Sequence, residues 1–310
     1  MTRRVYEMKP TPLEELTDPR QDLEKRFGKY GHVVMPEESE APILTPLVRA
    51  ALHQWLYEMN AAEELQAVGL TPRSRAILSG PPGCGKTTLA HHIAARLGLP
   101  LVVVQSQQVI ESSLGGSGNN IAGLFREARR KGVEVALFFD EFDALAKARR
   151  GVQQACDAEQ NNITIAILQE MDRFDGLLFA ATNSTADIDA AVWRRFQIQI
   201  EIGFPGADER FAIVKRYLAP FLADDAVVFG LSDAMDGASP ALIKEACEGA
   251  KRSLVLGERM GLANDLPAIM TRFAASAAPA DDMPVPRLWA EPGTVLADLR
   301  PLPWPPELAS

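Results

Sequence analysis

The sequence predicts an α/β fold, in which helices cover both faces of a parallel five-stranded sheet, followed by a small all-helical domain. Two observations lead to this prediction. Short apolar runs alternate with helical patterns between residues 76 and 202, and strands that alternate with helices of this length form parallel sheets. After Pro205 the apolar periodicity is wholly helical. We therefore expect a sandwich of helix, sheet and helix layers at residues 41–204 and a helical lid domain at residues 205–275.

The first elements are an arm, a helix and the strands. Residues 1–40 are charged and interrupted by proline, so we expect a polar N-terminal arm that is extended or adaptable. Apolar residues at helical spacing in residues 44–65 predict an amphipathic helix leading into the core. Five apolar runs then predict the strands, in the order AILS, LVVVQ, VALFFD, LLFAAT and IQIEI.

The lid and a C-terminal tail follow. Three helical patterns predict the lid, namely DERFAIVKRYLAPFL, SPALIKEACEGAKRSLVLGE and residues 266–275. Residues 276–310 contain eight prolines and two tryptophans, and proline interrupts both helix and sheet. We expect a Pro-rich tail in which Trp289 and Trp304 dock on a partner protein, since exposed tryptophan is common as an interface anchor. A tail folded back on its own core is the alternative.

Composition excludes several classes of protein. The chain has 310 residues, 47% hydrophobic and 24% charged, as in globular proteins. No apolar run approaches the length of a membrane span, and the first residues lack the apolar core of a signal peptide, so we expect a cytoplasmic protein. Three widely spaced cysteines without a CxxC pair give neither a disulfide framework nor a zinc site. The net charge of −9 disfavours a dominant nucleic-acid surface, although a local basic patch in an oligomer is compatible with it.

The segment GPPGCGKTT follows the first parallel strand and opens a helix. It matches the phosphate-loop pattern G-x-x-x-x-G-K-[ST] in the context that the pattern requires. Glycines let successive backbone N–H groups curl around a polyphosphate, and the helix start adds its positive end. Lys86 is placed to bind the β- and γ-phosphates, and Thr87 to bind Mg²⁺. The predicted nucleotide-binding residues of this loop are Gly80, Pro81, Pro82, Gly83, Cys84, Gly85, Lys86, Thr87 and Thr88.

Polar side chains at the ends of two later strands predict the rest of the site. Asp140 and Glu141 end the strand VALFFD, and in parallel sheets such a position lies beside the phosphate loop. We expect Asp140 to hold Mg²⁺ through water and Glu141 to deprotonate the attacking water. Asp143 is expected at a helix start. Asn183 ends the strand LLFAATN and can bind the γ-phosphate or the attacking water; a turn-forming role is equally compatible with its position.

Two adjacent arginines, Arg194 and Arg195, precede the last strand, far along the sheet from the phosphate loop. An arginine fork stabilises charge on a transferring phosphoryl group, and it can be supplied by a neighbouring subunit. The alternative is a surface pair that binds a local carboxylate.

Together these motifs resemble the AAA clade of the AAA+ ATPases, over roughly residues 44–275. GPPGCGKT is similar to the clade's Walker A motif, LFFDEFDA to Walker B, FAATN to sensor 1, and IDAAVWRRF to the stretch with paired arginine fingers. LQEMDRF resembles the region through which subunits communicate, with Arg173 where a glycine is usual. DGASPALIKEAC resembles the lid segment in which a Gly-Ala element, here Gly237 and Ala238, replaces a sensor arginine.

The resemblance implies an ATP- and Mg²⁺-dependent homo-oligomer, most often a hexameric ring, with ATP between subunits. The clade's usual motif near the adenine cannot be identified in this sequence. The segment ESSLGGSGNN corresponds to a pore loop that in many members reads aromatic, aliphatic, glycine. Here Leu114 and Gly115 fit, whereas Ser113 occupies the aromatic position and offers little contact area for gripping a polypeptide.

These observations favour an ATP-hydrolysing ring that regulates, assembles or remodels a partner protein. The alternative is a nucleotide-gated scaffold that does not thread polypeptide, controlling an effector such as a protease in a defence module. A DNA-directed ATPase is disfavoured by the acidic composition and by the type of lid. The sequence leaves the partner, the ring size and the adenine contacts open.

Overall fold

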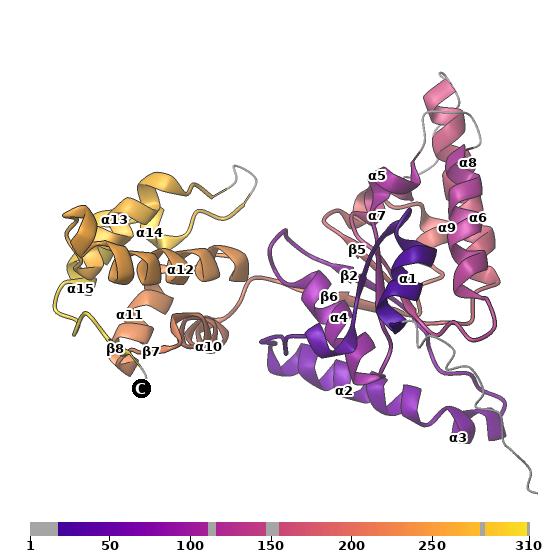
Figure 1. Ribbon diagram of the computed structural model, residues 1–310, viewed down its shortest axis with the longest axis horizontal. Coiled ribbons are helices and arrows are strands. Elements are labelled where there is room, and N and C mark those ends of the chain that lie inside the picture. Colours follow the sequence, from indigo (N-terminus) through magenta and orange to yellow (C-terminus); the bar gives the residue numbers. More distant parts are fainter. Residues whose placement is uncertain (1–17, 111–115, 147–154, 280–282, 309–310) are drawn as a thin grey trace, which may run out of the picture.

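Two lobes make up the part of the chain that the structure describes (Figure 1). The structure is a computed structural model that describes residues 18–110, 116–146, 155–279 and 283–308, and for residues 155–160 only the backbone. Described residues up to 202 form an α/β lobe, and those from 207 on form a helical lobe. The α/β sheet and the helical region expected from the apolar periodicity are therefore both present.

A six-stranded sheet with the order β1-β3-β4-β5-β2-β6 forms the centre of the α/β lobe. The strands from β3 to β6 in this order run parallel to their neighbours. They are the five strands predicted from the apolar runs: β2 (Arg75–Ser79), β3 (Leu101–Val104), β4 (Ala136–Phe139), β5 (Leu178–Thr182) and β6 (Ile198–Glu201). The inner strands β3, β4 and β5 are buried at every residue, as expected for a sheet covered on both faces.

Alternate residues of these strands face two different cores, which defines three layers. Val102, Leu137 and Phe139 belong to a core shared with α1 (Pro19–Phe27), α6 (Gly116–Ala128) and α8 (Ala155–Asp172). Leu101 and Phe138 belong to a core shared with α2 (Pro46–Asn60) and α4 (Lys86–Arg96). Shorter elements complete the lobe: η1 (Pro36–Glu38), α3 (Ala62–Ala67), α5 (Ser106–Val109), α7 (Phe142–Leu145), η2 (Thr185–Asp187) and α9 (Ala190–Trp193).

The expected N-terminal arm requires a correction, because most of its described part is folded. Residues of α1 pack on the sheet, and β1 (Gly31–Val34) pairs antiparallel with β3 as a sixth strand. Phe27 and Tyr30 are buried in the core beside α6, and Arg26 forms an ion pair with Glu127 of that helix, 2.8 Å apart. Local polarity misled the prediction, because the buried side chains of Phe27, Tyr30 and Val33 attach this short segment to the core.

The helical lobe contains α10 (Ala207–Leu218), α11 (Asp225–Ala234), α12 (Pro240–Leu256), η3 (Glu258–Met260) and α13 (Leu266–Ser276). Side-chain oxygens of Asp224, Ser239 and Asp265 cap the N-termini of α11, α12 and α13. Proline follows the cap in α12 and α13, a position where its missing N–H costs no hydrogen bond. These local signals explain why α12 and α13 begin where the sequence indicated, whereas α11 was not predicted from the sequence.

The C-terminal tail also differs from its expected form. It forms α14 (Arg287–Ala290), α15 (Pro292–Leu299) and β8 (Glu307–Leu308), which pairs with β7 (Phe221–Leu222). Leu288, Val295 and Leu299 are each 1% exposed in the core of the helical lobe, and Trp289 and Trp304 pack against that core. The described tail is thus part of the lobe, which corrects the expectation of two exposed, docking tryptophans.

Candidate functional site

The glycine-rich loop connects β2 to α4 in a conformation that only glycine adopts readily. Gly80, Gly83 and Gly85 have φ of +145°, +74° and +90°. A Cβ at Gly80 would lie 2.0 Å from the carbonyl oxygen of Ile202, whereas one at Gly85 would meet nothing within 4 Å. Gly85 is the N-cap of α4 and provides no side-chain cap. The first N–H groups of this 11-residue helix therefore remain available to an anion.

Lys86 places its ammonium group inside this loop. The side chain is 8% exposed and donates to the carbonyl oxygens of Gly80 (2.8 Å) and Pro81 (2.9 Å) and to Oδ1 of Asn183 (2.8 Å). Burial lowers the pKa of Lys86, with smaller opposing contributions from nearby acidic groups. A buried cation held only by neutral oxygens favours an anionic ligand beside it. The contact also joins the loop to Asn183 at the end of β5.

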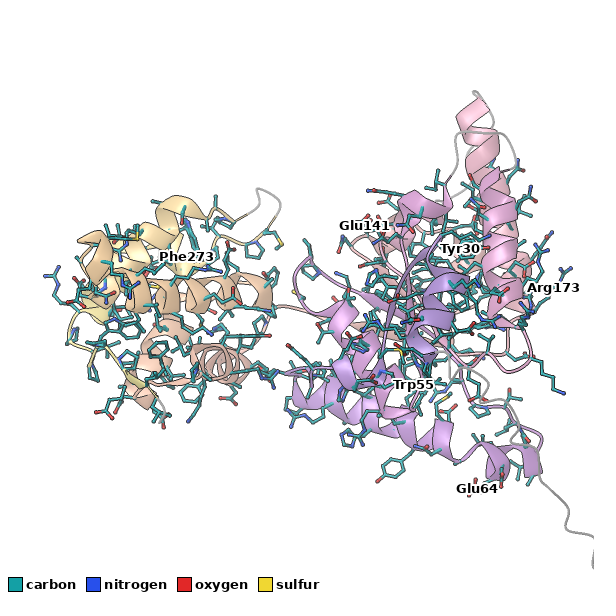
Figure 2. The ribbon with its side chains drawn as sticks, viewed as in Figure 1. Tyr30, Trp55, Glu64, Glu141, Arg173 and Phe273 are labelled. Carbon is teal, nitrogen blue, oxygen red and sulfur yellow. The ribbon has the colours of Figure 1, made fainter. Side chains whose placement is uncertain are left out.

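Asp140 and Glu141 follow β4 at the same edge of the sheet. Oδ2 of Asp140 accepts a hydrogen bond from Oγ1 of Thr87 (3.3 Å), and Oδ1 accepts from the backbone N–H of Glu141 (3.0 Å). Glu141 has φ +49°, the one positive φ among described non-glycine residues. Such a backbone costs about 1–3 kcal/mol and is concentrated at functional sites. The side chain of Glu141 is exposed, on the side of the α/β lobe that faces the helical lobe (Figure 2).

Asp143 lies in the first turn of α7, as predicted. Its Oδ1 is also 3.0 Å from the hydroxyl of Thr182, the last residue of β5. The same hydroxyl accepts from the backbone N–H of Ser184 (3.0 Å). These bonds hold the segment after β4 against the segment after β5. They fix the backbone on both sides of Asn183 and Glu141, a positioning role that the sequence did not indicate.

A cavity of about 420 Å³ lies between these residues and the lid. From the α/β lobe, Lys86, Thr87, Asp140, Glu141 and Asn183 line it, together with Pro82, Gly83, Gly85 and Thr88. From elsewhere it is lined by Glu40, Tyr217, Pro240, Ala241 and Lys244. The N–H of Ala241 donates to the carbonyl oxygen of Gly83 (3.2 Å). The start of α12 therefore contacts the loop directly and closes one side of the cavity.

Residues 39–45 cross from the α/β lobe to the lid and back, along this cavity. Glu40 lines the cavity, and the carbonyl oxygen of Ala41 accepts from Nη1 of Arg216 in α10 (2.6 Å). Ile43 packs against the core of the helical lobe. Thr45 then caps α2, which belongs to the α/β lobe. We call residues 39–45 the strap.

Several predicted residues lie elsewhere. Cys84 is 6% exposed and points into the core beside α4, and burial raises the pKa of its thiol. Gly80 and Pro81 line a neighbouring cavity of about 690 Å³, together with Asn183. Gly237, with φ +81°, and Ala238, 1% exposed, line a third cavity of about 230 Å³ beside Pro284 and Pro286. The structure thus brings Pro240 and Ala241, rather than the predicted Gly-Ala pair, to the cavity beside Lys86.

Arg194 and Arg195 lie at the end of α9, before β6, and line none of the cavity beside Lys86. Nε and Nη2 of Arg195 donate to the two carboxylate oxygens of Asp172 at 2.7 and 2.8 Å, and Nη1 donates to the carbonyl of Ala191 at 2.9 Å. This pairing lowers the pKa of Asp172. Arg194 is exposed, and its side chain has no hydrogen bond or ion pair to any described residue, whereas its backbone N–H donates to the carbonyl of Ala190 (3.2 Å). The predicted loop residues Ser113, Leu114 and Gly115 lie outside the described residues.

The donor set of the cavity fits a magnesium nucleotide. Free N–H groups at a helix start and a buried ammonium group suit a polyphosphate. The hydroxyl of Thr87, hydrogen-bonded to the carboxylate of Asp140, provides oxygens of the kind that Mg²⁺ prefers. The described residues contain no group of three His, Cys, Asp or Glu side chains placed to hold a metal alone.

Three residues that line the cavity, namely Glu40, Tyr217 and Lys244, were not predicted from the sequence. Glu40 belongs to a segment that reads as a polar arm, and Tyr217 and Lys244 occupy ordinary positions in amphipathic helices. Lys244 Nζ lies 5.1 Å from the centre of the Tyr217 ring. Only the packing of the lid against the loop brings these residues together, and no fixed spacing in the sequence records that packing.

Comparison with known proteins identifies the same region. Residues 76–204 match the family model described as ATPase family associated with various cellular activities (AAA). Over 207 residues the chain is 37% identical to an uncharacterized AAA family ATPase, y4kL, of Sinorhizobium fredii, covering 65% of this chain and 60% of that protein. It is 31% identical over 208 residues to proteasome-activating nucleotidase 1 of Haloferax volcanii, covering 65% of this chain and 51% of that one.

A third relative is the ATP-dependent zinc metalloprotease FtsH of Rhodothermus marinus, 34% identical over 182 residues, which are 56% of this chain and 26% of that protein. The chain thus spans 60% or less of these relatives. Among its described residues, every helix is too short or too polar to cross a bilayer.

Proposed function

Because this chain belongs to the AAA family of ATPases, we propose that it forms an ATP-hydrolysing ring that regulates, assembles or remodels a partner protein. The observation that carries the proposal is the cavity in which Lys86, Thr87, Asp140, Glu141 and Asn183 meet the start of the lid helix α12. These groups come from three different strand ends. Their meeting at one point supports a role for them in binding and hydrolysing ATP.

In this proposal Lys86 and the N–H groups of the loop hold the phosphates. Mg²⁺, when bound, would neutralise negative charge that develops on the phosphates. Thr87 and Asp140 are the residues that would hold it, Asp140 through water. Oδ1 of Asn183 accepts a hydrogen bond from Lys86 Nζ (2.8 Å), so its Nδ2 can donate to the γ-phosphate or to the attacking water. Lys86 and Asn183 thereby respond together to the terminal phosphate.

Glu141 accepts the proton of the attacking water at its carboxylate. Its exposed side chain is free to approach that water, while its backbone is held by Asp140 and by the segment around Asp143. Arg194 and Arg195 lie outside the cavity, which supports their action on the nucleotide of a neighbouring subunit. We therefore propose a ring, of six subunits by analogy with the AAA clade, with ATP at each interface.

The nature of the partner rests on the relatives. Two of them are named for protein degradation, as a proteasome-activating nucleotidase and as a zinc metalloprotease. The acidic composition, with a net charge of −9, also favours a protein partner over DNA. Stimulation of ATP turnover by an unfolded protein, and not by DNA, is the expected result in a steady-state assay. Stimulation by DNA alone would contradict a protein partner.

The first prediction concerns the two central residues. Glu141→Gln keeps the shape of the side chain but removes the base, so ATP binds while turnover falls by about 10²- to 10⁴-fold. Lys86→Ala removes the cation at the phosphates, so binding itself weakens. Nucleotide affinity and phosphate release are measured separately for each variant. Glu64→Gln, an exposed glutamate on α3 far from the cavity (Figure 2), is the matched control. Wild-type turnover by Glu141→Gln would overturn the assignment of the base.

A further inference from the structure

The cavity of about 690 Å³ lies next to the nucleotide cavity, with which it shares Pro82 and Asn183. Its other lining residues come from β2, the phosphate loop, the segment from β5 to β6, and the tail: Ser79, Gly80, Pro81, Thr185, Trp193, Gln199, Glu201, Phe204, Met283 and Pro284. Among the described residues, Glu201 is the one charged side chain that lines it. An acidic cavity with two aromatic rings suits a cationic ligand that has a partly apolar body.

Several polar side chains of this cavity are not used by the fold. Glu201 is exposed, and its carboxylate forms no ion pair with any described residue. Thr185 and Gln199 are exposed as well, and within the described ranges neither side chain makes a hydrogen bond. Trp193 packs partly against the core, and its indole N–H has no acceptor in the described part of the chain. A carboxylate, an indole and two neutral polar groups are therefore available to a ligand.

The strand β6 presents an open edge beside this cavity. It pairs with β2 on one side and, among the described strands, with none on the other. Just after β6, the N–H of Ile202 donates to the carbonyl oxygen of Ser79 in β2 (2.8 Å). Backbone N–H groups alternate sides along a strand, so those of Gln199 and Glu201 point to the open edge. The side chains of the same two residues line the cavity, so edge and cavity form one surface.

We propose that this surface binds an extended segment of a partner protein, in which an arginine faces Glu201 and Trp193. The segment adds a strand to β6 through backbone hydrogen bonds, and a side chain in the cavity gives specificity. Arginine fits best because its planar guanidinium group pairs with a carboxylate through two hydrogen bonds and also stacks on aromatic rings. The inference rests on the proposed function, for which it names the surface that the partner protein contacts.

A short synthetic peptide provides the test. Acetyl-Ser-Thr-Val-Arg-Val-Thr-Ser-amide, with a fluorophore at one end, has the composition of a strand and one central arginine. Its binding to the full chain is measured by fluorescence anisotropy. Two matched peptides carry citrulline, an uncharged isostere of arginine, or glutamate at the centre. We expect the arginine peptide to bind most tightly and the glutamate peptide most weakly, because like charges directly opposite each other across strands are destabilising.

A double-mutant cycle locates the arginine. Glu201→Gln in the protein and citrulline in the peptide each remove the same charge pair, so each weakens binding about two- to fivefold. The two changes together weaken it no further than one, because the pair is already absent. Glu64→Gln, at an exposed site on α3, is the control and leaves the affinity unchanged. Circular dichroism of each variant confirms that the fold is retained. Additive effects would place the arginine elsewhere and overturn the proposal.

Methylation of peptide nitrogens tests the pairing with β6. One of the two alternate sets of N–H groups faces β6, so methylating that set removes binding and methylating the other set does not. Equal effects of the two sets, or no binding of the arginine peptide, would contradict the added strand. Dissociation of assemblies of this chain by the peptide, seen in mass photometry, would show that a second copy occupies the edge instead. Because binding is the readout, failure of this inference is distinguishable from failure of the proposed ATP hydrolysis.

Discussion

At the scale of single residues, Arg194 and Arg195 are neighbours in different surroundings. Three of the five N–H donors of Arg195 are bound by Asp172 and Ala191, which leaves two for another molecule. Its orientation is fixed before any neighbour arrives. Arg194 has no such anchor among the described residues, although it occupies the same edge of the sheet. The two arginines are thus suited to different tasks, one to a fixed contact and the other to an adaptable one.

Asp172→Asn tests this difference. The amide cannot accept both hydrogen bonds from Arg195, so the guanidinium loses its fixed orientation, and turnover per assembled ring falls roughly ten- to hundredfold. Because Asp172 is about half exposed, we expect a loss of stability below about 1 kcal/mol. Turnover and thermal unfolding are measured together, with Asp175→Asn as the control. A change in stability without a change in turnover would show that the pair is only structural.

The pH dependence of this pair has a definite sign. Since Arg195 lowers the pKa of Asp172, the carboxylate stays ionised as pH falls below its unfolded pKa of about 3.9. The stabilisation is complete above that value and is lost as pH falls through the lower pKa of the folded state. The contact is therefore intact at neutral pH, and any loss of turnover between pH 6 and 8 must have another origin.

At the scale of elements, the C-terminal tail shows where local composition misleads. Two of its prolines stand where a helix needs no N–H: Pro286 is the N-cap of α14, and Pro292 is at the start of α15. The parallel strands and the phosphate loop were predictable because their apolar runs and glycine spacing are local. The tail and β1 were not predictable from local sequence, because their structure depends on a few apolar side chains that contact a core distant in the sequence. Glu40, Tyr217 and Lys244 were likewise not predictable as residues of the cavity, because only the packing of the lid against the α/β lobe brings them together.

Leu299→Ala measures the contribution of the tail. Leu299 is 1% exposed in the core of the helical lobe, so its truncation leaves a cavity and lowers the free energy of unfolding by about 2–5 kcal/mol. Leu222→Ala, at a site that is 64% exposed, is the control and changes it by less than about 0.5 kcal/mol. Chemical denaturation gives both values. Equal effects for the two variants would mean that the tail does not contribute to the core.

At the scale of the whole molecule, catalysis is expected to need two copies. The cavity of one chain contains Lys86 and Glu141 but neither Arg194 nor Arg195. Specific activity should therefore rise steeply with protein concentration as the oligomer forms.

Mixing variants separates the two contributions. An Arg195→Ala chain keeps an intact cavity, and a Glu141→Gln chain keeps an intact arginine. A contact between them can pair the two intact parts, so the mixture regains some of the turnover that each variant lacks. The control is the Arg195→Ala variant alone, at the same total protein concentration as the mixture. An equally inactive mixture, or specific activity that does not depend on concentration, would contradict action across subunits.

The strap gives the lid a second attachment to the α/β lobe. One attachment is the segment 203–206, and the other is the pair of contacts made by Ala41 and Ile43. A body held at one point can swing in any direction, whereas a body held at two points turns only about the line that joins them. The lid is held at two such points, the segment 203–206 and the strap. An opening that separates α12 from Gly83 must therefore either turn the lid about these two attachments or break the hydrogen bond between Arg216 and Ala41.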